Sequence, residues 1–401
     1  MSERTTCAII GGGPAGMMLG LLLARAGVQV TVLEKHGDFL RDFRGDTVHP
    51  TTLELLEELG LGERFAELHH SRVEQLTAET GDGSMLTIGD FRRLRLKHPY
   101  IAMVPQWDLL NLLAEAGREE PAFTLRMSTE ATGLLRESGR VAGVRYEGPE
   151  GPGEVRADLT VACDGRWSMA RRAVDLPLRE HPVGFDTWWF QVPVQGTTAP
   201  TLTPRTGPGT LVVPIPREHH LQIAYMGRKG TDAELRARGI EALRREIAEM
   251  MPELAGSVGA LASMDDVKHL DVRLNRLSRW HTDGLLCIGD AAHAMSPIGG
   301  VGINLAVQDS VAAATLLAEP LKNRKATGRH LDAVRRRRAL PVAVAQRMQK
   351  SLHTRLVEPI VEGRRPALLK PLAAVVRALP QLSVVPAYLV GVGVRPERAP
   401  A

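Results

Sequence analysis

The residues of this chain that could bind a nucleotide begin near the N-terminus, in a glycine-rich turn. Gly11, Gly13 and Gly16 form the pattern GxGxxG directly after an apolar run, and Glu34 ends the next apolar run. The first glycine permits a tight turn, the second leaves room for a pyrophosphate beside the backbone, and the third lets a helix pack closely. An acidic residue at the end of the second strand is placed to bind a ribose hydroxyl. The pattern therefore predicts a dinucleotide site, whose turn also includes Pro14 and Ala15.

A second candidate segment begins with Asp164 and Gly165, which follow an apolar run and precede a helix containing Arg171. The carboxylate of Asp164 could cap backbone amides or accept a hydrogen bond from a ribose hydroxyl, and the guanidinium of Arg171 could balance phosphate charge. Asp-Gly turns are common in proteins. The segment alone therefore leaves both a functional role and an ordinary turn open.

A third segment combines an acidic residue with a loop of small residues. A buried strand is expected to deliver Asp290 to the edge of a sheet, and the glycine-rich loop 297–302 follows. Because glycine has no side chain, a flat ring can lie against this backbone. The helix that begins at Asn304 adds a positive dipole, which suits a ring that becomes anionic, such as a reduced flavin. The candidate residues of this segment are Gly289, Asp290, Pro297, Gly299, Gly300, Val301, Gly302 and Asn304.

The elements that must position these segments do not alternate simply between strand and helix. Residues 73–97, 141–161 and 185–228 carry short alternating stretches around turns, which favours antiparallel strands. Residues 232–251 and 304–318 have the spacing of helices. We therefore expect a nucleotide-binding domain that is interrupted by β-rich insertions. Its parts are residues 1–72, 98–184 and 271–330, with a β-rich substrate domain in 73–97 and 185–270 and a C-terminal helical segment in 331–401.

The composition is that of a soluble globular protein, with 44% hydrophobic and 24% charged residues. A net charge of +4 on 401 residues and an aromatic content of 4% argue against nucleic acid binding. Three scattered cysteines build neither a disulfide framework nor a zinc site, and no metal is expected. Because no signal peptide and no uninterrupted apolar run of transmembrane length is recognisable, we expect a cytoplasmic protein without stable membrane insertion.

Two segments outside the motifs have alternative interpretations. The apolar stretch 366–394 is interrupted by prolines, which favours packing on the nucleotide-binding domain over contact with a membrane or a partner. The basic run Arg335–Arg338 favours a solvated helix face over an anion-binding patch. The sequence leaves open whether the protein is a monomer or a homodimer.

Taken together, the three motifs resemble the signatures of FAD-dependent aromatic hydroxylases related to para-hydroxybenzoate hydroxylase, which are single-component flavoprotein monooxygenases. The resemblance covers about residues 5–320, and Arg395–Glu397 is similar to the tails of bacterial members. It implies an α/β fold, in which a Rossmann-like FAD-binding domain of the GR2 type is interrupted by a β-sheet-rich substrate domain and followed by C-terminal helices. It also implies FAD as cofactor and NAD(P)H as transient co-substrate. O2 and a flavin C4a-hydroperoxide would then hydroxylate an aromatic or polyketide-like small molecule.

The resemblance also implies roles for individual residues. Glu34 resembles the ligand of the adenosine ribose, Arg44 the arginine near the FAD diphosphate, and Gln106 a residue that contacts FAD. Asp290 resembles the aspartate at the ribityl chain and diphosphate, and the loop Pro297–Gly302 lies beside the isoalloxazine in the family. Asp164, Gly165 and Arg171 resemble the segment linked to FAD and the pyridine nucleotide.

The substrate pocket is expected beneath the β-rich insertion, because the reaction must be kept away from water. Candidate lining residues on the stretch 210–228 are Leu211, Val213, Ile223, Tyr225 and Met226. His219 and His220 read as a hairpin tip, so we assign no catalytic base. His293 is favoured as a packing or hydrogen-bonding residue.

Other functions of the same fold remain open on the sequence alone. A flavin-dependent halogenase or a prenyl reductase would share the cofactor motifs, although Trp188–Pro193 does not match the halogenase segment Trp-x-Trp-x-Ile-Pro. A non-catalytic flavin-binding protein is a third possibility, against which the intact glycines and both aspartates argue.

Overall fold

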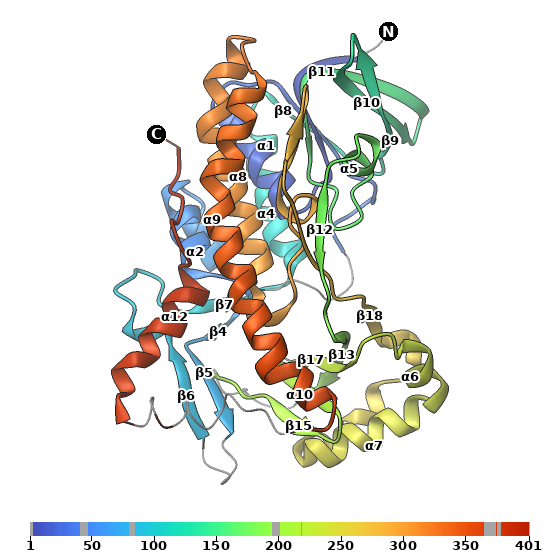
Figure 1. Cartoon of the computed structure of the whole chain (residues 1–401), viewed down its shortest axis with the longest axis vertical. Helices are drawn as coiled ribbons and strands as arrows, with labels where there is room; N and C mark the ends of the chain where they lie inside the picture. Colours follow the sequence, from blue (N-terminus) through green and yellow to red (C-terminus); the bar gives the residue numbers. More distant parts are fainter. Residues whose placement is uncertain are drawn as a thin grey trace.

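The computed structural model is elongated, with the largest sheet at one end and a second group of sheets at the other (Figure 1). The structure describes residues 3–40, 47–79, 85–194, 201–217, 219–364, 374 and 378–400.

The largest sheet is built around the N-terminal strand–helix–strand unit. β1 (Glu3–Ile10) pairs in parallel with β2 (Val30–Leu33) and with β11 (Gly151–Ala162), and α1 (Pro14–Arg25) connects β1 to β2. The strand order is β20-β21-β11-β1-β2-β8, and β10 and β9 continue the sheet antiparallel from β11. The remaining strands are β8 (Phe123–Arg126), β9 (Glu130–Glu137), β10 (Arg140–Gly148), β20 (His281–Thr282) and β21 (Leu285–Cys287). The central strands β1 and β2 are largely buried, and α1 and α8 pack against β1.

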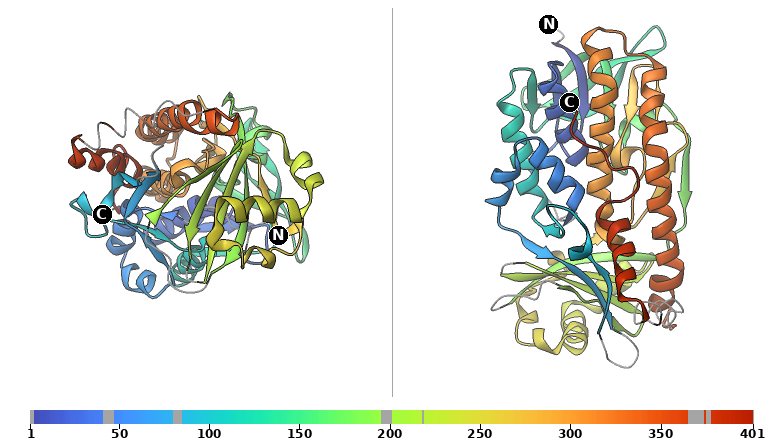
Figure 2. Two further views of the ribbon diagram at one scale, coloured as in Figure 1. Left: turned by 90° about the horizontal axis from the view of Figure 1, so that it is seen from below. Right: turned by 90° about the vertical axis from the view of Figure 1, so that its left-hand side faces the viewer.

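Long helices stand beside this sheet and run towards the second region (Figure 2). α8 (Val301–Lys322) packs against α1 and α9 (Gly328–Leu352), and α4 (Gln106–Arg118) packs on the other side of α1. The segment 298–322 is long and apolar enough to cross a membrane, yet most of it is buried inside the protein. Its apolar sequence therefore builds the core. Shorter helices are α2 (Pro50–Glu58), α3 (Gly62–Ala66) and α5 (Met169–Ala173).

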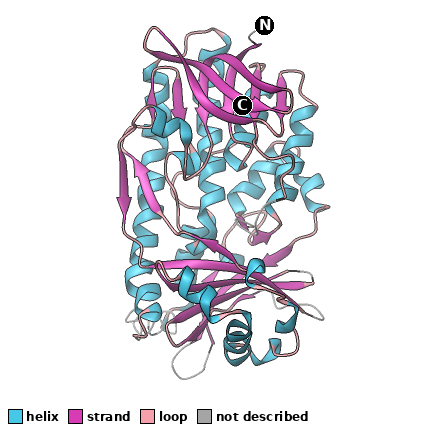
Figure 3. Cartoon of the chain, turned by 90° about the vertical axis from the view of Figure 1, so that its right-hand side faces the viewer, coloured by secondary structure: helices cyan, strands magenta, loops and turns pink. Residues whose placement is uncertain are grey.

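The second region contains a five-stranded antiparallel sheet in the order β15-β16-β17-β13-β18 (Figure 3). Its strands are β13 (Phe185–Pro193), β15 (Arg205–Gly207), β16 (Thr210–Pro216), β17 (His220–Arg228) and β18 (Lys268–Leu270). α6 (Asp232–Arg238) and α7 (Ile240–Met250) cover its outer face. The helix expected over 232–251 is therefore two helices, because Gly239 between them has a φ of +76°. β12 (Leu178–His181) pairs with β19 (Leu274–Leu277) between the two regions.

Two three-stranded sheets complete the β structure. One has the order β3 (Thr47–Val48), β7 (Ile101–Met103), β4 (Ser71–Val73), and the other β14 (Thr201–Leu202), β5 (Gln75–Glu79), β6 (Met85–Asp90). The expected hairpin within 73–97 is confirmed by the antiparallel pairing of β5 with β6. The hairpin within 141–161 is confirmed by β10 and β11.

The C-terminal part of the chain returns across both regions. After α9 a π-helical segment, His353–Val357, leads into α10 (Glu358–Val361). α12 (Val384–Gly391) buries Ala387 and Val390 against β6 and the 3-10 helix Phe91–Arg93. The inner face of α12 is therefore packed against the rest of the protein. Its outer face leaves Val385, Tyr388 and Leu389 exposed.

Candidate functional site

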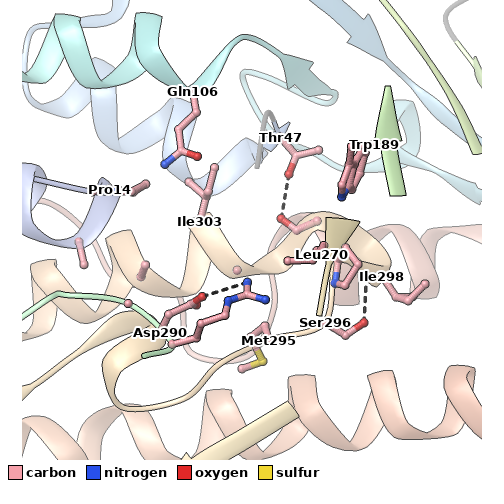
Figure 4. A pocket seen from close by; sticks show the side chains of 18 of the residues that line it. Pro14, Thr47, Gln106, Trp189, Leu270, Asp290, Met295, Ser296, Ile298 and Ile303 are labelled. Carbon is pink, nitrogen blue, oxygen red and sulfur yellow. Dashed lines mark hydrogen bonds and ion pairs between the residues drawn. The ribbon is translucent and has the colours of Figure 1, made fainter. Parts of the chain in front are cut away.

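A cavity of about 790 Å³ lies between the large sheet and the five-stranded sheet. At one end it is lined by the β1–α1 turn, and at the other by side chains of β13, β16 and β17. Figure 4 shows Pro14 of the turn, Trp189 of β13 and Asp290 around the same space. A volume of this size is in the range of cofactor and small-molecule sites.

The glycine-rich turn meets the cavity through Gly11, Gly13, Pro14 and Ala15. Gly11 has a φ of +99°, and a Cβ there would lie 2.6 Å from a backbone carbonyl oxygen. A Cβ on Gly16 would lie 1.9 Å from the carbonyl oxygen of Gly11, so the helix packs here only with glycine. A Cβ on Gly13 would meet no protein atom within 4 Å. The turn and the N-terminus of α1 thus form an open cradle for a diphosphate.

Glu34 lies at the end of β2, is buried, and lines the cavity. Its Oε2 accepts a hydrogen bond of 2.8 Å from the amide of Gly12, and its Oε1 accepts one of 3.0 Å from the amide of His36. These amides fix the carboxylate beside the turn. Gln106, the first residue of α4, also lines the cavity. Arg44 lies outside the described residues.

Asp164 lines the cavity at the end of β11, together with Gly165. Its Oδ2 accepts from the amide of Ala170 at 3.2 Å, whereas its buried Oδ1 has no hydrogen-bond partner among the described residues. Burial raises the pKa of Asp164. Since buried polar atoms are nearly always paired, Oδ1 is suited to accept a ligand hydroxyl. This orphaned oxygen and the glycine cradle both fit FAD.

Arg171 does not line the cavity, which corrects its expected place beside a phosphate. It is buried, and its guanidinium donates to the carbonyl oxygens of Ala291 at 2.9 Å and Arg166 at 2.7 Å. It therefore holds the second motif against the third. Two other arginines of this segment, Arg166 and Arg172, line the cavity, and Nη2 of Arg166 lies 3.5 Å from Oδ2 of Asp290. The position of Arg166 directly after the Asp-Gly turn was the available signal.

The third motif reaches the cavity through Asp290, Pro297, Gly299, Gly300 and Gly302. Gly299 and Gly300 have φ values of +80° and +63°. Three further candidates do not line it, namely Gly289, Val301 and Asn304.

Structural contacts account for these three residues. A Cβ on Gly289 would lie 3.2 Å from Cβ of Ala15, so this glycine allows the first and third motifs to touch. Val301 is buried in the core. Asn304 uses its Oδ1 to accept hydrogen bonds from the hydroxyls of Thr51 at 2.9 Å and Thr52 at 2.7 Å.

The carbonyl of Gly300 is held from the side of β3. It accepts a hydrogen bond from Oγ1 of Thr47 at 2.9 Å and lies 3.0 Å from Nε2 of His49. Nδ1 of the same imidazole lies 2.8 Å from the carbonyl oxygen of Val390 in α12. Burial lowers the pKa of His49 to about 4. The buried ring thus links the glycine-rich loop to the C-terminal helix.

A buried ionic network supports the loop from behind, centred on Asp309 of α8. Its Oδ2 accepts from the amide of Gly289 at 3.1 Å and lies 2.5 Å from Nε2 of His293. Its Oδ1 accepts from Nε of Arg338 at 3.0 Å, and Arg338 also contacts Glu397 at 3.5 Å. Burial alone would raise the pKa of Asp309, but His293 and Arg338 outweigh burial, so the pKa lies below its usual range.

Two expectations from the sequence concern residues of this network. His293 is a hydrogen-bonding residue, as expected. Arg338 is buried, with 1% of its side chain exposed, so the basic run is not wholly a solvated face.

The five-stranded sheet lines the cavity with Leu211 and Val213 of β16 and with Met226 of β17. Ile223 and Tyr225 point to the other face and pack with α7, which corrects their assignment to the pocket. The hydroxyl of Tyr225 donates to Glu246 at 2.8 Å, and burial raises its pKa to about 12. Successive strand residues face opposite sides, so Tyr225 and Met226 cannot both line one pocket.

His220 begins β17 at the hairpin end, where its carbonyl accepts from the amide of Arg217 at 2.9 Å. The hairpin expected at these histidines is confirmed.

Ser296 is a lining residue that the sequence motifs did not indicate. Its Oγ lies 2.9 Å from Nε2 of His353, the first residue of the π-helical segment. Gln349 donates to the carbonyl oxygens of Ser296 at 2.9 Å and Ile298 at 2.8 Å. Burial lowers the pKa of His353 to about 4, so the ring is neutral at pH 7. Ser296 and His353 are 57 residues apart in the chain, and no local pattern marks their contact.

Comparison with known proteins agrees with this geometry. A family profile described as FAD binding domain matches residues 4–348. The chain is similar to 6-methylpretetramide 4-monooxygenase of Streptomyces rimosus, with 36% identity over 96% of this chain and 90% of the relative. It is 28% identical to anhydrotetracycline monooxygenase of the same species, over 77% of this chain and 61% of the relative.

Solved structures share the fold. Anhydrotetracycline hydroxylase OxyS from Streptomyces rimosus superposes with a TM-score of 0.78 at 24% identity, over 97% of this chain and 76% of that chain. The flavin-dependent brominase Bmp2 superposes with a TM-score of 0.75 at 16% identity, over 97% of this chain and 94% of that chain. At these identities the likeness concerns the fold alone.

Proposed function

The chain belongs to the FAD-dependent aromatic hydroxylases, a family of flavoprotein monooxygenases, and from this premise we propose that its substrate is a polycyclic aromatic polyketide. Two relatives are named for 6-methylpretetramide and anhydrotetracycline. NAD(P)H and O2 are the co-substrates of this class. Because all three cysteines are free thiols, we propose a cytoplasmic location.

One observation carries the proposal: a single cavity joins the glycine cradle of α1 to the apolar face of the five-stranded sheet. The N-terminus of α1 would hold the FAD diphosphate, Glu34 the adenosine ribose, and Asp290 with Arg166 the middle of the cofactor. The loop Pro297–Gly302 would bring the ring to the sheet. Bound there, FAD supplies electron transfer from NAD(P)H and the activation of O2.

The protein itself positions the reactants and excludes water from the reacting end of the cavity. Leu211, Val213 and Met226 present apolar side chains to the reacting end, which keeps water away from reactive oxygen. A halogenase of this fold is expected to place a lysine in its substrate site, but among the described lining residues the one lysine, Lys35, lies beside Glu34 at the nucleotide end. The sheet end therefore favours hydroxylation over halogenation.

The test is turnover with the purified flavoprotein. NADPH and NADH oxidation, H2O2 release and product mass are measured with and without phenols of one to four rings. Stimulated oxidation with a product heavier by one oxygen atom is expected for fused-ring phenols. A halide-dependent product, or oxidation that no phenol stimulates, would contradict the proposal.

The cofactor assignment is tested by Asp290→Ala, which should purify with little FAD. The control is Asp283→Ala, in the exposed turn before β21, which should keep its FAD. Full yellow occupancy of Asp290→Ala would refute the role of that carboxylate.

A further inference from the structure

Two neighbouring tryptophans of β13 lie on opposite faces of the five-stranded sheet. Trp188 faces α6, and its Nε1 donates to Oδ1 of Asp232 at 2.7 Å. Trp189 lines the cavity, and its ring projects from the strand into the pocket (Figure 4). Only 8% of the residue is exposed, and its buried Nε1 has no hydrogen-bond partner among the described residues. A buried indole N–H normally has an acceptor. The missing acceptor is a feature that a ligand can supply.

A buried cation lines the same half of the cavity. Arg217 extends β16 by one residue, is 6% exposed, and lies on the cavity-facing side of the strand with Val213 and Ile215. The acidic residues that line the cavity, Glu34, Glu130, Asp164 and Asp290, come from the other half. Among the described lining residues, Arg217 is therefore the charged residue of the sheet half. It offers only donors.

The pairing register separates these two donors. Trp189 pairs with Ala224, and Ala224 pairs with Val213, so the three residues form one row across the sheet. Arg217 lies four residues beyond Val213, which is about 13 Å along the strand, and two strands from Trp189, which is about 9 Å across. A single aromatic ring cannot reach both groups at once. A ligand of several fused rings can.

We propose that Trp189 and Arg217 form the two ends of a substrate subsite for an elongated, fused-ring ligand with acceptor oxygens at both ends. The indole N–H takes a carbonyl or phenol oxygen, and the guanidinium takes an enolate or phenolate. This inference rests on the proposed hydroxylase function and narrows its substrate class. The two side chains act by orienting the ring that is hydroxylated, and they discriminate against single-ring phenols.

The experiment measures binding to the FAD-loaded protein by ligand-induced changes in flavin absorbance. The probes are anhydrotetracycline, which has four fused rings, a panel of three-ring phenols, and para-nitrophenol as the single-ring control. Arg217→Met should weaken binding of the fused-ring probes about tenfold to a hundredfold, as expected for a hydrogen bond to a charged group. Trp189→Phe should weaken it about twofold to tenfold. Both variants should leave para-nitrophenol within twofold of wild type.

Matched controls separate recognition from folding. Trp188→Phe changes the neighbouring indole on the opposite face, and Arg228→Met changes an exposed arginine of β17. Both should bind the fused-ring probes as wild type does. Arg217→Lys keeps the charge and should recover part of the affinity, which guards against misfolding of the methionine variant.

Three results would overturn the subsite: fused-ring binding by Arg217→Met within twofold of wild type, equal loss of para-nitrophenol, or a wild-type protein that binds no fused-ring probe. FAD content and probe-free NADPH oxidation are recorded for every variant. A wild type that binds fused-ring probes but oxidises neither NADPH nor NADH would refute the proposed function and leave the subsite standing.

Discussion

Removal of the Arg338 side chain should strongly lower the free energy of unfolding. It is 1% exposed and pairs with Asp309 and Glu397, which are 0% and 4% exposed. Arg338→Met keeps an apolar stem but removes the cation that two buried carboxylates share, and leaves Asp309 with His293 and Glu397 with Arg337. Removal of one partner from a buried ion pair costs about 3–5 kcal/mol. Since a domain is stable by about 5–15 kcal/mol, this is a large share of the free energy of unfolding.

The neighbouring arginine provides the comparison. Arg337 also pairs with Glu397, at 2.5 Å, but 41% of its side chain is exposed. Arg337→Met should therefore cost about 1 kcal/mol or less. Urea unfolding at pH 7.5, with saturating FAD and far-UV circular dichroism, measures both variants, and equal m-values are required for the comparison. If Arg338→Met and Arg337→Met differ by less than about 1 kcal/mol, burial of the network does not govern its strength. Adding Glu397→Gln to Arg338→Met should recover part of the loss, because the second carboxylate is then neutral.

Three further predictions follow from single contacts. His49 and His353 have pKa values of about 4 in the folded protein and about 6.5 in the unfolded chain, so the unfolded chain binds protons first as pH falls. The free energy of unfolding should therefore drop by about 2 kcal/mol per histidine from pH 7.5 to 5. His49→Gln should flatten the measured pH profile of unfolding. Gly16→Ala should lower both stability and FAD content, since its Cβ would lie 1.9 Å from a carbonyl oxygen. Gly13→Ala should keep wild-type stability and lose FAD affinity, because its Cβ would meet no protein atom within 4 Å. If both variants lose stability in urea unfolding and affinity in FAD titration to the same extent, this distinction is wrong. Tyr225→Phe should leave the KM for the aromatic substrate unchanged, because the ring faces α7, and a raised KM would place it in the pocket.

The glycine-rich motifs could be read from the sequence because their requirements are local. Gly11 needs a left-handed backbone, and Gly16 needs the absence of a Cβ. The residues around a motif could not be assigned in the same way. Three arginines follow Asp164, and Arg166 and Arg172 line the cavity, whereas Arg171 is held by the carbonyl of Ala291 in the third motif, more than a hundred residues later.

The substrate wall shows a second limit of the sequence. Alternation along β17 divides its residues into two sets, and each set contains apolar residues. Which set faces the cavity depends on where α7 packs, and that packing is a tertiary choice. The expected list therefore mixed the two sets: Met226 lines the cavity, whereas Ile223 and Tyr225 face α7. Ser296 and His353 were missed because their contact joins separate elements without any sequence spacing in common.

The buried network also has a consequence for the timing of biosynthesis. Arg338 and Glu397 are 59 residues apart, so at about 5–20 residues per second the ribosome needs about 3–12 s between them. During that interval Arg338 can already meet Asp309, but it lacks its second carboxylate partner. The buried network behind the glycine-rich loop is therefore complete only after residue 397 has been translated.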